Sequence, residues 1–448
     1  MYASFKQIKI AVGKLFCVSA PVLGLVATLA SGFMAAVVNA EQAVPVEIRK
    51  LEQGYQVFRD GVPYDIKGAG LSDANDTEFL LQQLKAAGAN SIRTWHVGNG
   101  KILDQAHKLG LTVSLCLDVK RERHGFDYNN QKAVAQQLKK FRKQVLKHKD
   151  HPALLAWIIG NELNHDYKNP KVYDAVNNIS KMIHELDPHH PTTTTTAGIN
   201  NELAQVIQAR APDLDFLSVQ VYGGLLGLGD ALNNIQLNKP LMVTEWGTVG
   251  HWEVDKTLWN APIELTSEEK AGHYLLGFTD VIKPLQGQVI GNYMFLWGQK
   301  QERTPTWYGV FTANMQSTPA VDVMHYIWRG KWPDNRAPNL TSMTLGGKQA
   351  YDNVLLKRGK KFVAQVQVAD ETDTAELNYR WQLLAESDSD ASGGDYEELP
   401  RDFSRFVKST GVGTAEVKAP IAGRYRLFVT VSDEQGKAAH ANIPFIVQ

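Results

Sequence analysis

Cysteine is almost absent from this sequence. Its 448 residues include only two cysteines, Cys17 and Cys116, and Cys17 falls in an apolar N-terminal stretch. A disulfide framework is therefore excluded. Stability must come from a hydrophobic core, and a chain of this length can bury most of its surface in one.

An excess of charge of either sign is also missing, because 47 basic side chains balance 47 acidic ones. This balance gives no electrostatic reason to bind nucleic acid. Metal-binding patterns are lacking as well: no His-x-His pair occupies the first predicted strand, and His189-His190 precedes a proline in a predicted loop. We therefore expect no metal and no other cofactor.

The N-terminus has the features of an export signal. Lysines precede an apolar stretch at 15–38, and Val38-Asn-Ala40 offers small residues where a signal peptidase cuts. This pattern predicts a signal peptide at 1–40 and a periplasmic or secreted mature chain that starts near Glu41. Because about 20 apolar residues can also span a bilayer, an uncleaved membrane anchor stays open.

Strand-like runs alternate with helix-like ones between Tyr64 and about Trp328, which is typical of a parallel sheet covered by helices. We place the strands at 65–68, 89–94, 112–117, 154–160, 192–196, 216–221, 241–245 and 291–297. This α/β pattern predicts a (β/α)8 TIM barrel at 41–332. A hairpin at 54–61, turning at Asp60-Gly61, is expected to close its N-terminal mouth.

The pattern changes to period-two strands beyond the barrel, for example at 362–368 and 424–431. It predicts a β-sandwich accessory domain at 339–448. The last strands resemble the terminal hairpin of immunoglobulin-like accessory domains in secreted polysaccharide enzymes. The segment 386–395 is acidic and rich in glycine and serine, which predicts a mobile loop.

Two glutamates, Glu162 and Glu245, each come where an apolar strand-like run ends. The C-terminal ends of all barrel strands open onto one face, so the two carboxyl groups can meet over one substrate. Enzymatic cleavage of a glycosidic bond needs at least two carboxyl groups that face each other across the bond, one protonated and the other ionised. We assign Glu162 as the acid/base and Glu245 as the nucleophile of a retaining mechanism.

Aromatic side chains near strand ends suit a glycan site, because the C–H face of a pyranose is apolar. Trp95 and Trp246 follow the second and seventh predicted strands, and His96 is a further candidate to touch the sugar. The alternative for the two tryptophans is packing in the core.

The two motifs Gly160-Asn-Glu162 and Thr244-Glu245-Trp-Gly resemble the signatures of the clan A retaining glycoside hydrolases. The barrel is most similar to that of family 2 and of the β-1,3-glucanosyltransferases, and less so to family 5. This resemblance implies that the acid/base ends strand four and the nucleophile ends strand seven. Further roles are implied at four strand ends: Arg93 pairs with the nucleophile, Asn161 contacts the sugar 2-hydroxyl, Tyr222 hydrogen-bonds the nucleophile and Trp297 lies beneath the sugar.

The sequence thus predicts a retaining β-glycosidase acting on an extracytoplasmic β-linked glycan or oligosaccharide. A transglycosylase using the same residues and a non-catalytic carbohydrate-binding protein are the alternatives, and a metal-dependent barrel hydrolase is a third class that lacks its ligands. A full family 2 enzyme carries β-domains before its barrel, for which the expected mature chain has little room, so the family's particular activities are not carried over. The sugar, the linkage and the oligomeric state are left open.

Overall fold

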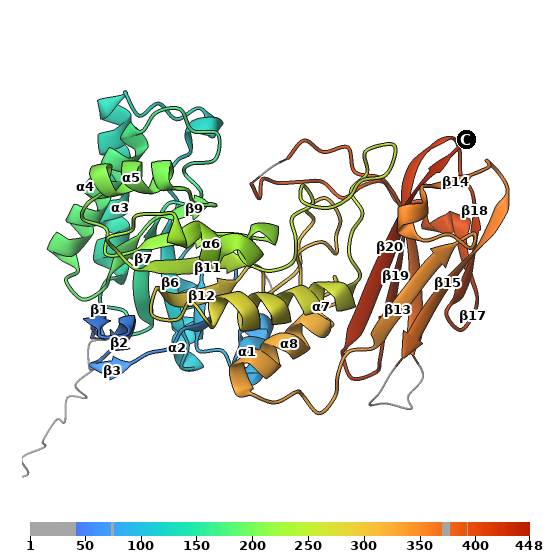
Figure 1. The fold of residues 1–448 in the computed structure, drawn as a ribbon, viewed down its shortest axis with the longest axis horizontal. Helices are drawn as coiled ribbons and strands as arrows, with labels where there is room; N and C mark the ends of the chain where they lie inside the picture. Colours follow the sequence, from blue (N-terminus) through green and yellow to red (C-terminus); the bar gives the residue numbers. More distant parts are fainter. Residues whose placement is uncertain (1–41, 73–75, 370–376, 392) are drawn as a thin grey trace, which may run out of the picture. The chain divides into compact units, whose positions relative to one another are not determined.

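The computed structural model describes residues 42–72, 76–369, 377–391 and 393–448 (Figure 1). The predicted signal peptide at 1–40 lies outside these residues. Within the described ranges, no helix combines the length and the apolar character needed to cross a bilayer.

A parallel sheet that curves round on itself forms the first part of the fold, with strand order β8-β7-β6-β5-β4-β12-β11-β10-β9. Its strands are β4 (Lys67–Gly70), β5 (Ser91–Arg93), β6 (Thr112–Leu117), β7 (Leu154–Ile159), β8 (Thr192–Thr193), β9 (Thr195–Ala197), β10 (Leu217–Gln220), β11 (Leu241–Trp246) and β12 (Val289–Met294). The two outermost strands, β8 and β9, are separated only by Thr194, so together they supply the predicted fifth strand and close the barrel. The TIM-barrel prediction is confirmed; the first strand begins two residues later than expected and the last two residues earlier.

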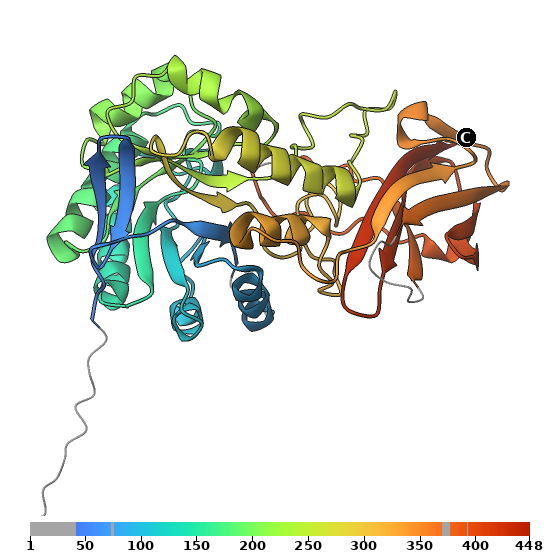
Figure 2. The same ribbon diagram turned by 60° about the horizontal axis from the view of Figure 1, so that its bottom comes forward.

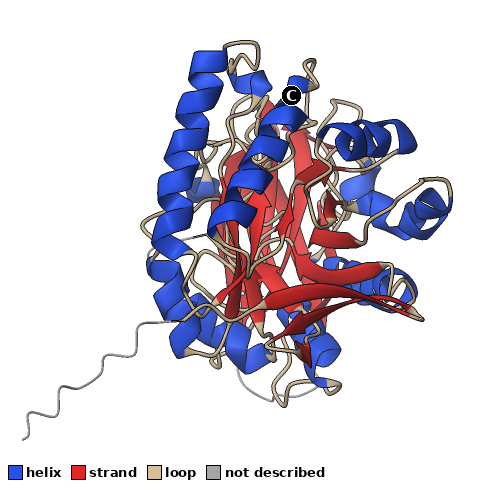
Figure 3. Ribbon diagram, turned by 90° about the vertical axis from the view of Figure 1, so that its left-hand side faces the viewer, coloured by secondary structure: helices blue, strands red, loops and turns tan. Residues whose placement is uncertain are grey.

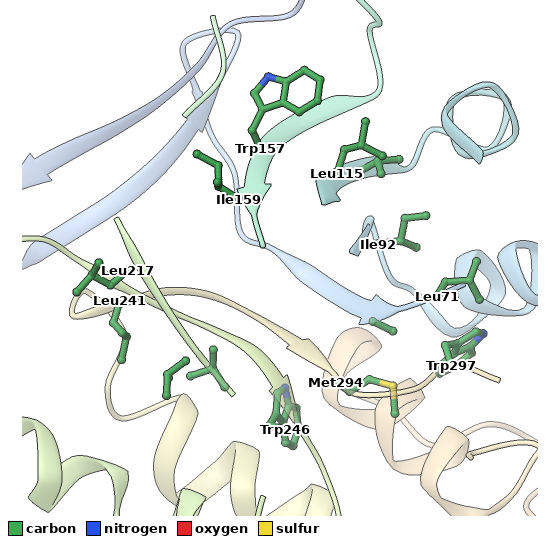
Figure 4. Packing of buried hydrophobic residues seen from close by; sticks show 14 of the residues in the cluster. Leu71, Ile92, Leu115, Trp157, Ile159, Leu217, Leu241, Trp246, Met294 and Trp297 are labelled. Atoms are coloured by element: carbon green, nitrogen blue, oxygen red, sulfur yellow. The ribbon is translucent and has the colours of Figure 1, made fainter. Parts of the chain in front are cut away.

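Helices surround these strands (Figure 3). They are α1 (Thr77–Ala87), α2 (Lys101–Lys108), α3 (Gln131–His148), α4 (Lys171–Leu186), α5 (Asn201–Arg210), α6 (Leu228–Asn233), α7 (Ser267–Leu276) and α8 (Pro319–Arg329). In α3, Phe141 and Val145 are buried against the strands while its lysines face solvent, as an outer barrel helix requires. Barrel-core side chains, Trp157 and Leu115 among them, lie along the strands (Figure 4).

The predicted hairpin is part of a small antiparallel sheet of β1 (Val46–Leu51), β2 (Gly54–Arg59) and β3 (Val62–Pro63), seen in Figure 2. Asp60 and Gly61 form the turn, with φ angles of 52° and 72°, as a tight hairpin turn requires. Val57 of β2 is buried in one cluster with side chains from the starts of β7, β11 and β12. The hairpin therefore covers the N-terminal end of the barrel, as predicted.

Antiparallel strands form the C-terminal part, in two four-stranded sheets with the orders β13-β15-β18-β17 and β14-β20-β19-β16. Their bounds are β13 (Asn339–Leu345), β14 (Val354–Leu356), β15 (Lys361–Ala369), β16 (Asn378–Ala385), β17 (Val407–Gly411), β18 (Thr414–Lys418), β19 (Gly423–Ser432) and β20 (Ala438–Val447). Side chains from both sheets, such as Leu340 and Leu427, share one apolar core. The β-sandwich prediction is confirmed.

Buried polar contacts join the sandwich to the barrel. Arg426 on β19 donates two hydrogen bonds to Glu386, one to Asn442 at 2.7 Å and one to the Pro262 carbonyl at 2.7 Å. The Asn442 amide in turn donates to Glu264 at 2.7 Å. Glu264 also accepts a hydrogen bond from Lys270 of α7 at 2.5 Å. The barrel and the sandwich belong to one compact unit.

Candidate active site

A cavity of about 400 Å³ lies at the C-terminal ends of the barrel strands, and both Glu162 and Glu245 line it. Its volume falls within the range of small-molecule sites. A second cavity, of about 360 Å³, lies at the hairpin end of the barrel, where Asp65 is the one acidic residue among its described lining. The predicted convergence of the two carboxyl groups is therefore found at the face where barrel strands end.

Four donors surround the carboxylate of Glu245. Its Oε1 accepts hydrogen bonds from Arg93, from Trp95 Nε1 at 2.7 Å and from Gln220 Nε2 at 2.8 Å. Its Oε2 accepts one from the Tyr222 hydroxyl at 2.8 Å. Burial, followed by the negative charges of the neighbouring glutamates, raises the pKa of Tyr222 well above its usual range, so this hydroxyl stays a donor. Donors directed at a carboxylate stabilise its ionised form.

Glu162 has a different environment. The chain leaves β7 through Gly160, with φ 79°, and Glu162 itself has φ 49°, a left-handed conformation that is uncommon outside glycine. No described residue donates a hydrogen bond to its carboxyl group. Burial, reinforced by the charge of Glu245 and opposed by Arg93, raises the pKa of Glu162 from 4.5 to about 8. This carboxyl group is therefore protonated at neutral pH.

The structure brings most of the predicted residues together around these two glutamates. Arg93 is fully buried behind the cavity and also donates to Asn161 Oδ1 at 2.9 Å. Asn161, Tyr222 and Trp95 line the cavity. Trp297 borders it as well, fixed by a hydrogen bond from its Nε1 to the Leu80 carbonyl at 3.0 Å.

Two predicted substrate contacts are not supported by the structure. Trp246 is fully buried, donates to Asn292 at 3.0 Å and packs on Tyr274 of α7, so it is outside the cavity lining. His96 is exposed and also outside that lining. For Trp246 the reason is that consecutive residues of a strand point to opposite sides, and β11 contains both Glu245 and Trp246. Trp95 and His96 lie in a bend after β5. Glu245 and Trp95 face the cavity, and the residue after each faces away from it.

Some residues of the site escaped the sequence analysis. Gln220, the last residue of β10, bridges Asn161 and Glu245 with two hydrogen bonds of 2.8 Å, and its place near the end of the sixth predicted strand was the signal that could have revealed it. Lys300 and Glu302, which form an ion pair of 2.7 Å after β12, also line the cavity. Burial raises the pKa of Glu302, against the opposing effect of Lys300. Further lining comes from Arg121, Trp252, Gly393 and Gly394.

The chemistry that this site permits is that of two carboxyl groups in unlike environments on one cavity. Burial without hydrogen-bond donors suits Glu162 to giving a proton, and four hydrogen-bond donors hold Glu245 in place as a nucleophile. Across the described ranges, no group of three or more His, Cys, Asp or Glu side chains is arranged to hold a metal ion.

The barrel and its glutamate pair place the chain in clan A of the glycoside hydrolases. Residues 65–330 match the family model described as the TIM barrel domain of glycosyl hydrolases family 2. This match extends over more than half of the sequence, and the chain belongs to that family. The resemblance inferred from the motifs around Glu162 and Glu245 is confirmed at this level.

Several relatives share parts of the chain. A β-glucuronidase of Streptococcus agalactiae serotype V is 26% identical over 266 residues, which are 51% of this chain and 42% of that protein. The structure of a Dictyoglomus thermophilum β-D-glucuronidase aligns with a TM-score of 0.51 and 20% identity, covering 65% of this chain and 54% of that one. Bacteroides uniformis β-glucuronidase 2 aligns with a TM-score of 0.50 and 16% identity, over 90% of this chain and 48% of that one. These structures share the fold, and this chain spans about half of their length or less.

Proposed function

We propose that this protein is a retaining β-glycoside hydrolase that acts on a β-linked glycan or oligosaccharide. The observation that carries the proposal is the pairing, in one cavity, of a protonated Glu162 with a Glu245 held by four donors. Double displacement needs this division between a proton donor and an anionic nucleophile. The family membership supports the same reaction.

In the first step, Glu245 attacks the anomeric carbon while the bond to the leaving oxygen breaks. Glu162 gives that oxygen its proton, so the aglycone departs as a neutral alcohol and the sugar is left as an ester of Glu245. Oε1 of Glu245 is already occupied by three donors, whereas Oε2 has one. We assign Oε2 as the attacking atom because its remaining lone pair is available.

In the second step, water replaces the aglycone. Ester formation removes the negative charge of Glu245, which is one of the causes that raise the pKa of Glu162. The pKa of Glu162 therefore falls in the intermediate, and Glu162 can take a proton from the water that attacks the anomeric carbon. Hydrolysis returns both carboxyl groups to their starting states.

The surrounding residues position these groups. Arg93 and Gln220 tie Glu245 to Asn161 Oδ1, which leaves the Asn161 amide nitrogen to contact a sugar hydroxyl. Trp95 offers apolar ring surface at the cavity wall, whereas Trp297 borders the cavity but is fully buried.

Transglycosylation is the second candidate, and one feature favours it. Trp252 lines the cavity yet is 55% exposed, so its ring is available to bind an acceptor sugar in place of water. A non-catalytic carbohydrate-binding role has less support, because it gives no reason for four donors on Glu245.

The substitution Glu245→Gln tests the catalytic assignment. We expect it to abolish turnover of aryl β-glycosides and β-glucans, while the matched change Glu185→Gln, at an exposed position of α4, leaves turnover unchanged. Proton NMR of the first wild-type product should show the β-anomer, and longer products would indicate transfer. Undiminished activity of the Glu245→Gln variant, or an α-anomer as first product, would contradict the mechanism.

We also propose that the chain is exported, on the basis of the lysines, apolar stretch and small residues of 1–40. N-terminal sequencing of the protein expressed at full length should find a mature start near Glu41. A retained N-terminus in the membrane fraction would indicate the anchor instead.

A further inference from the structure

Part of the cavity wall comes from the β-sandwich. Gly393 and Gly394, on the connection between β16 and β17, line the cavity together with Glu162 and Glu245. They lie in the segment that the sequence predicts to be a mobile loop. Described residues at the end of this segment nevertheless make specific contacts with the barrel.

An ion pair makes the first attachment. Arg123, which follows β6 of the barrel, donates to both carboxylate oxygens of Asp395, at 2.6 and 3.0 Å, and His124 Nε2 lies 3.3 Å from the same carboxylate. Burial on its own raises the pKa of Asp395, but the hydrogen bonds from Arg123 and His124 outweigh it and lower the pKa. Such a two-pronged contact fixes geometry as well as distance.

Glu397 makes the second attachment, two residues further on. Its carboxylate accepts hydrogen bonds from Gln301 Nε2 at 3.0 Å and from the Arg303 backbone at 2.8 Å. Gln301 and Arg303 flank Glu302, which lines the cavity. The sandwich segment therefore contacts the barrel on two loops that border the site.

The two glycines let the backbone approach closely. Their φ angles are 56° and 78°, which favour glycine. A Cβ on Gly393 would lie 3.0 Å from Arg123 Nη2 and from His165 Cδ2, and one on Gly394 would lie 3.7 Å from Lys300 Nζ. The segment thus touches the barrel where side chains would leave less room.

We propose that Gly393-Gly394 is a specificity wall of the catalytic cavity, held in place by the Arg123–Asp395 pair. The wall limits the cavity to about 400 Å³, the small end of the range for ligand sites. It therefore selects chain ends and short β-linked oligosaccharides over the interior of a polymer. This inference rests on the proposed function and gives the C-terminal part a role in substrate choice.

The test is Asp395→Asn, which keeps the shape of the side chain and removes its charge. The matched control is Asp174→Asn, because Asp174 also receives two hydrogen bonds from an arginine, Arg210, at 2.9 Å each, on the outer helices. We expect Asp395→Asn to raise KM for a β-linked oligosaccharide about 3- to 10-fold with kcat nearly unchanged. The ratio of activity on polymer to activity on oligosaccharide should rise by a similar factor.

A double variant and a binding measurement make the result decisive. Exchange of the two charges, Arg123→Asp with Asp395→Arg, should bring the raised KM part of the way back to the wild-type value, which a general loss of stability would not allow. Calorimetry with the same oligosaccharide, in the Glu245→Gln background, should show the same weakening of Kd on Asp395→Asn. If Asp395→Asn has the same KM and Kd as the Asp174→Asn control, the inference is overturned. Weakened binding without any turnover in the wild type would instead refute only the proposed hydrolysis.

Discussion

The unusual protonation of Glu162 has a consequence for stability that can be measured without a substrate. Folding raises the pKa of Glu162 from 4.5 to about 8. In the unfolded chain this carboxyl group loses its proton above pH 4.5, whereas in the folded chain it keeps the proton until about pH 8. The unfolded state therefore binds fewer protons in this window, and the free energy of unfolding falls as the pH rises.

Glu162→Gln removes this penalty because an amide does not ionise. A shift of this size corresponds to about 5 kcal/mol at 1.36 kcal/mol per pKa unit. The cavity is open to water, which screens the carboxyl group, so we expect a stabilisation of about 2–4 kcal/mol at pH 8 and nearly none at pH 4.5. Gln and Glu share the same strain at the φ of 49°, so strain does not contribute to the difference.

Urea unfolding followed by tryptophan fluorescence at pH 5 and pH 8 measures this difference. Glu185→Gln, which changes an exposed glutamate of α4, is the control and should track the wild type at both pH values. The reasoning is refuted if the gain from Glu162→Gln is the same at both pH values, or if the wild type is the more stable protein at pH 8.

Two further predictions concern the charges of buried side chains. The value of kcat/KM should fall above about pH 8, as Glu162 loses its proton. In Glu162→Gln this decline at alkaline pH should vanish, and turnover of substrates that have a poor leaving group should fall about 10²- to 10⁴-fold. A decline that persists in the variant would assign it to another group. Lys270→Met should lower the free energy of unfolding by about 3–5 kcal/mol in urea titrations, because it leaves the buried Glu264 without the lysine with which it forms an ion pair. If the free energy of unfolding falls no more than in an exposed lysine variant such as Lys139→Met, Lys270 contributes little to stability.

The barrel and its glutamate pair could be predicted because both depend on local patterns. Apolar runs mark the strands, and the parallel arrangement brings their C-terminal ends to one face. Alternation along each strand could have carried the prediction further. Since Glu245 faces the cavity, its neighbour Trp246 on the same strand has to face the helices. This position was knowable from the sequence once the glutamate was placed.

The Gly393-Gly394 wall of the cavity could not be predicted in this way. Arg123 and Asp395 lie far apart in the chain, and neither belongs to a repeating pattern. The glycines and serines near Asp395 indicate only that the backbone is free to turn, and their composition does not show which surface the turn meets. The contact depends on how the sandwich packs against the barrel, through buried groups such as Arg426 and Glu264.

The different environments of the two glutamates depend on where their strands end. β11 continues to Trp246, so Glu245 remains within the sheet, where Arg93 and Gln220 at the ends of β5 and β10 reach its carboxylate. β7 stops at Ile159, and the turn that follows carries Glu162 beyond the reach of strand-borne donors. The same barrel therefore gives one carboxyl group four hydrogen bonds and leaves the other, among the described residues, with none. Because donors stabilise the anion and burial without them favours the acid, the two carboxyl groups suit the opposite roles that we propose for them, Glu245 as the nucleophile and Glu162 as the proton donor.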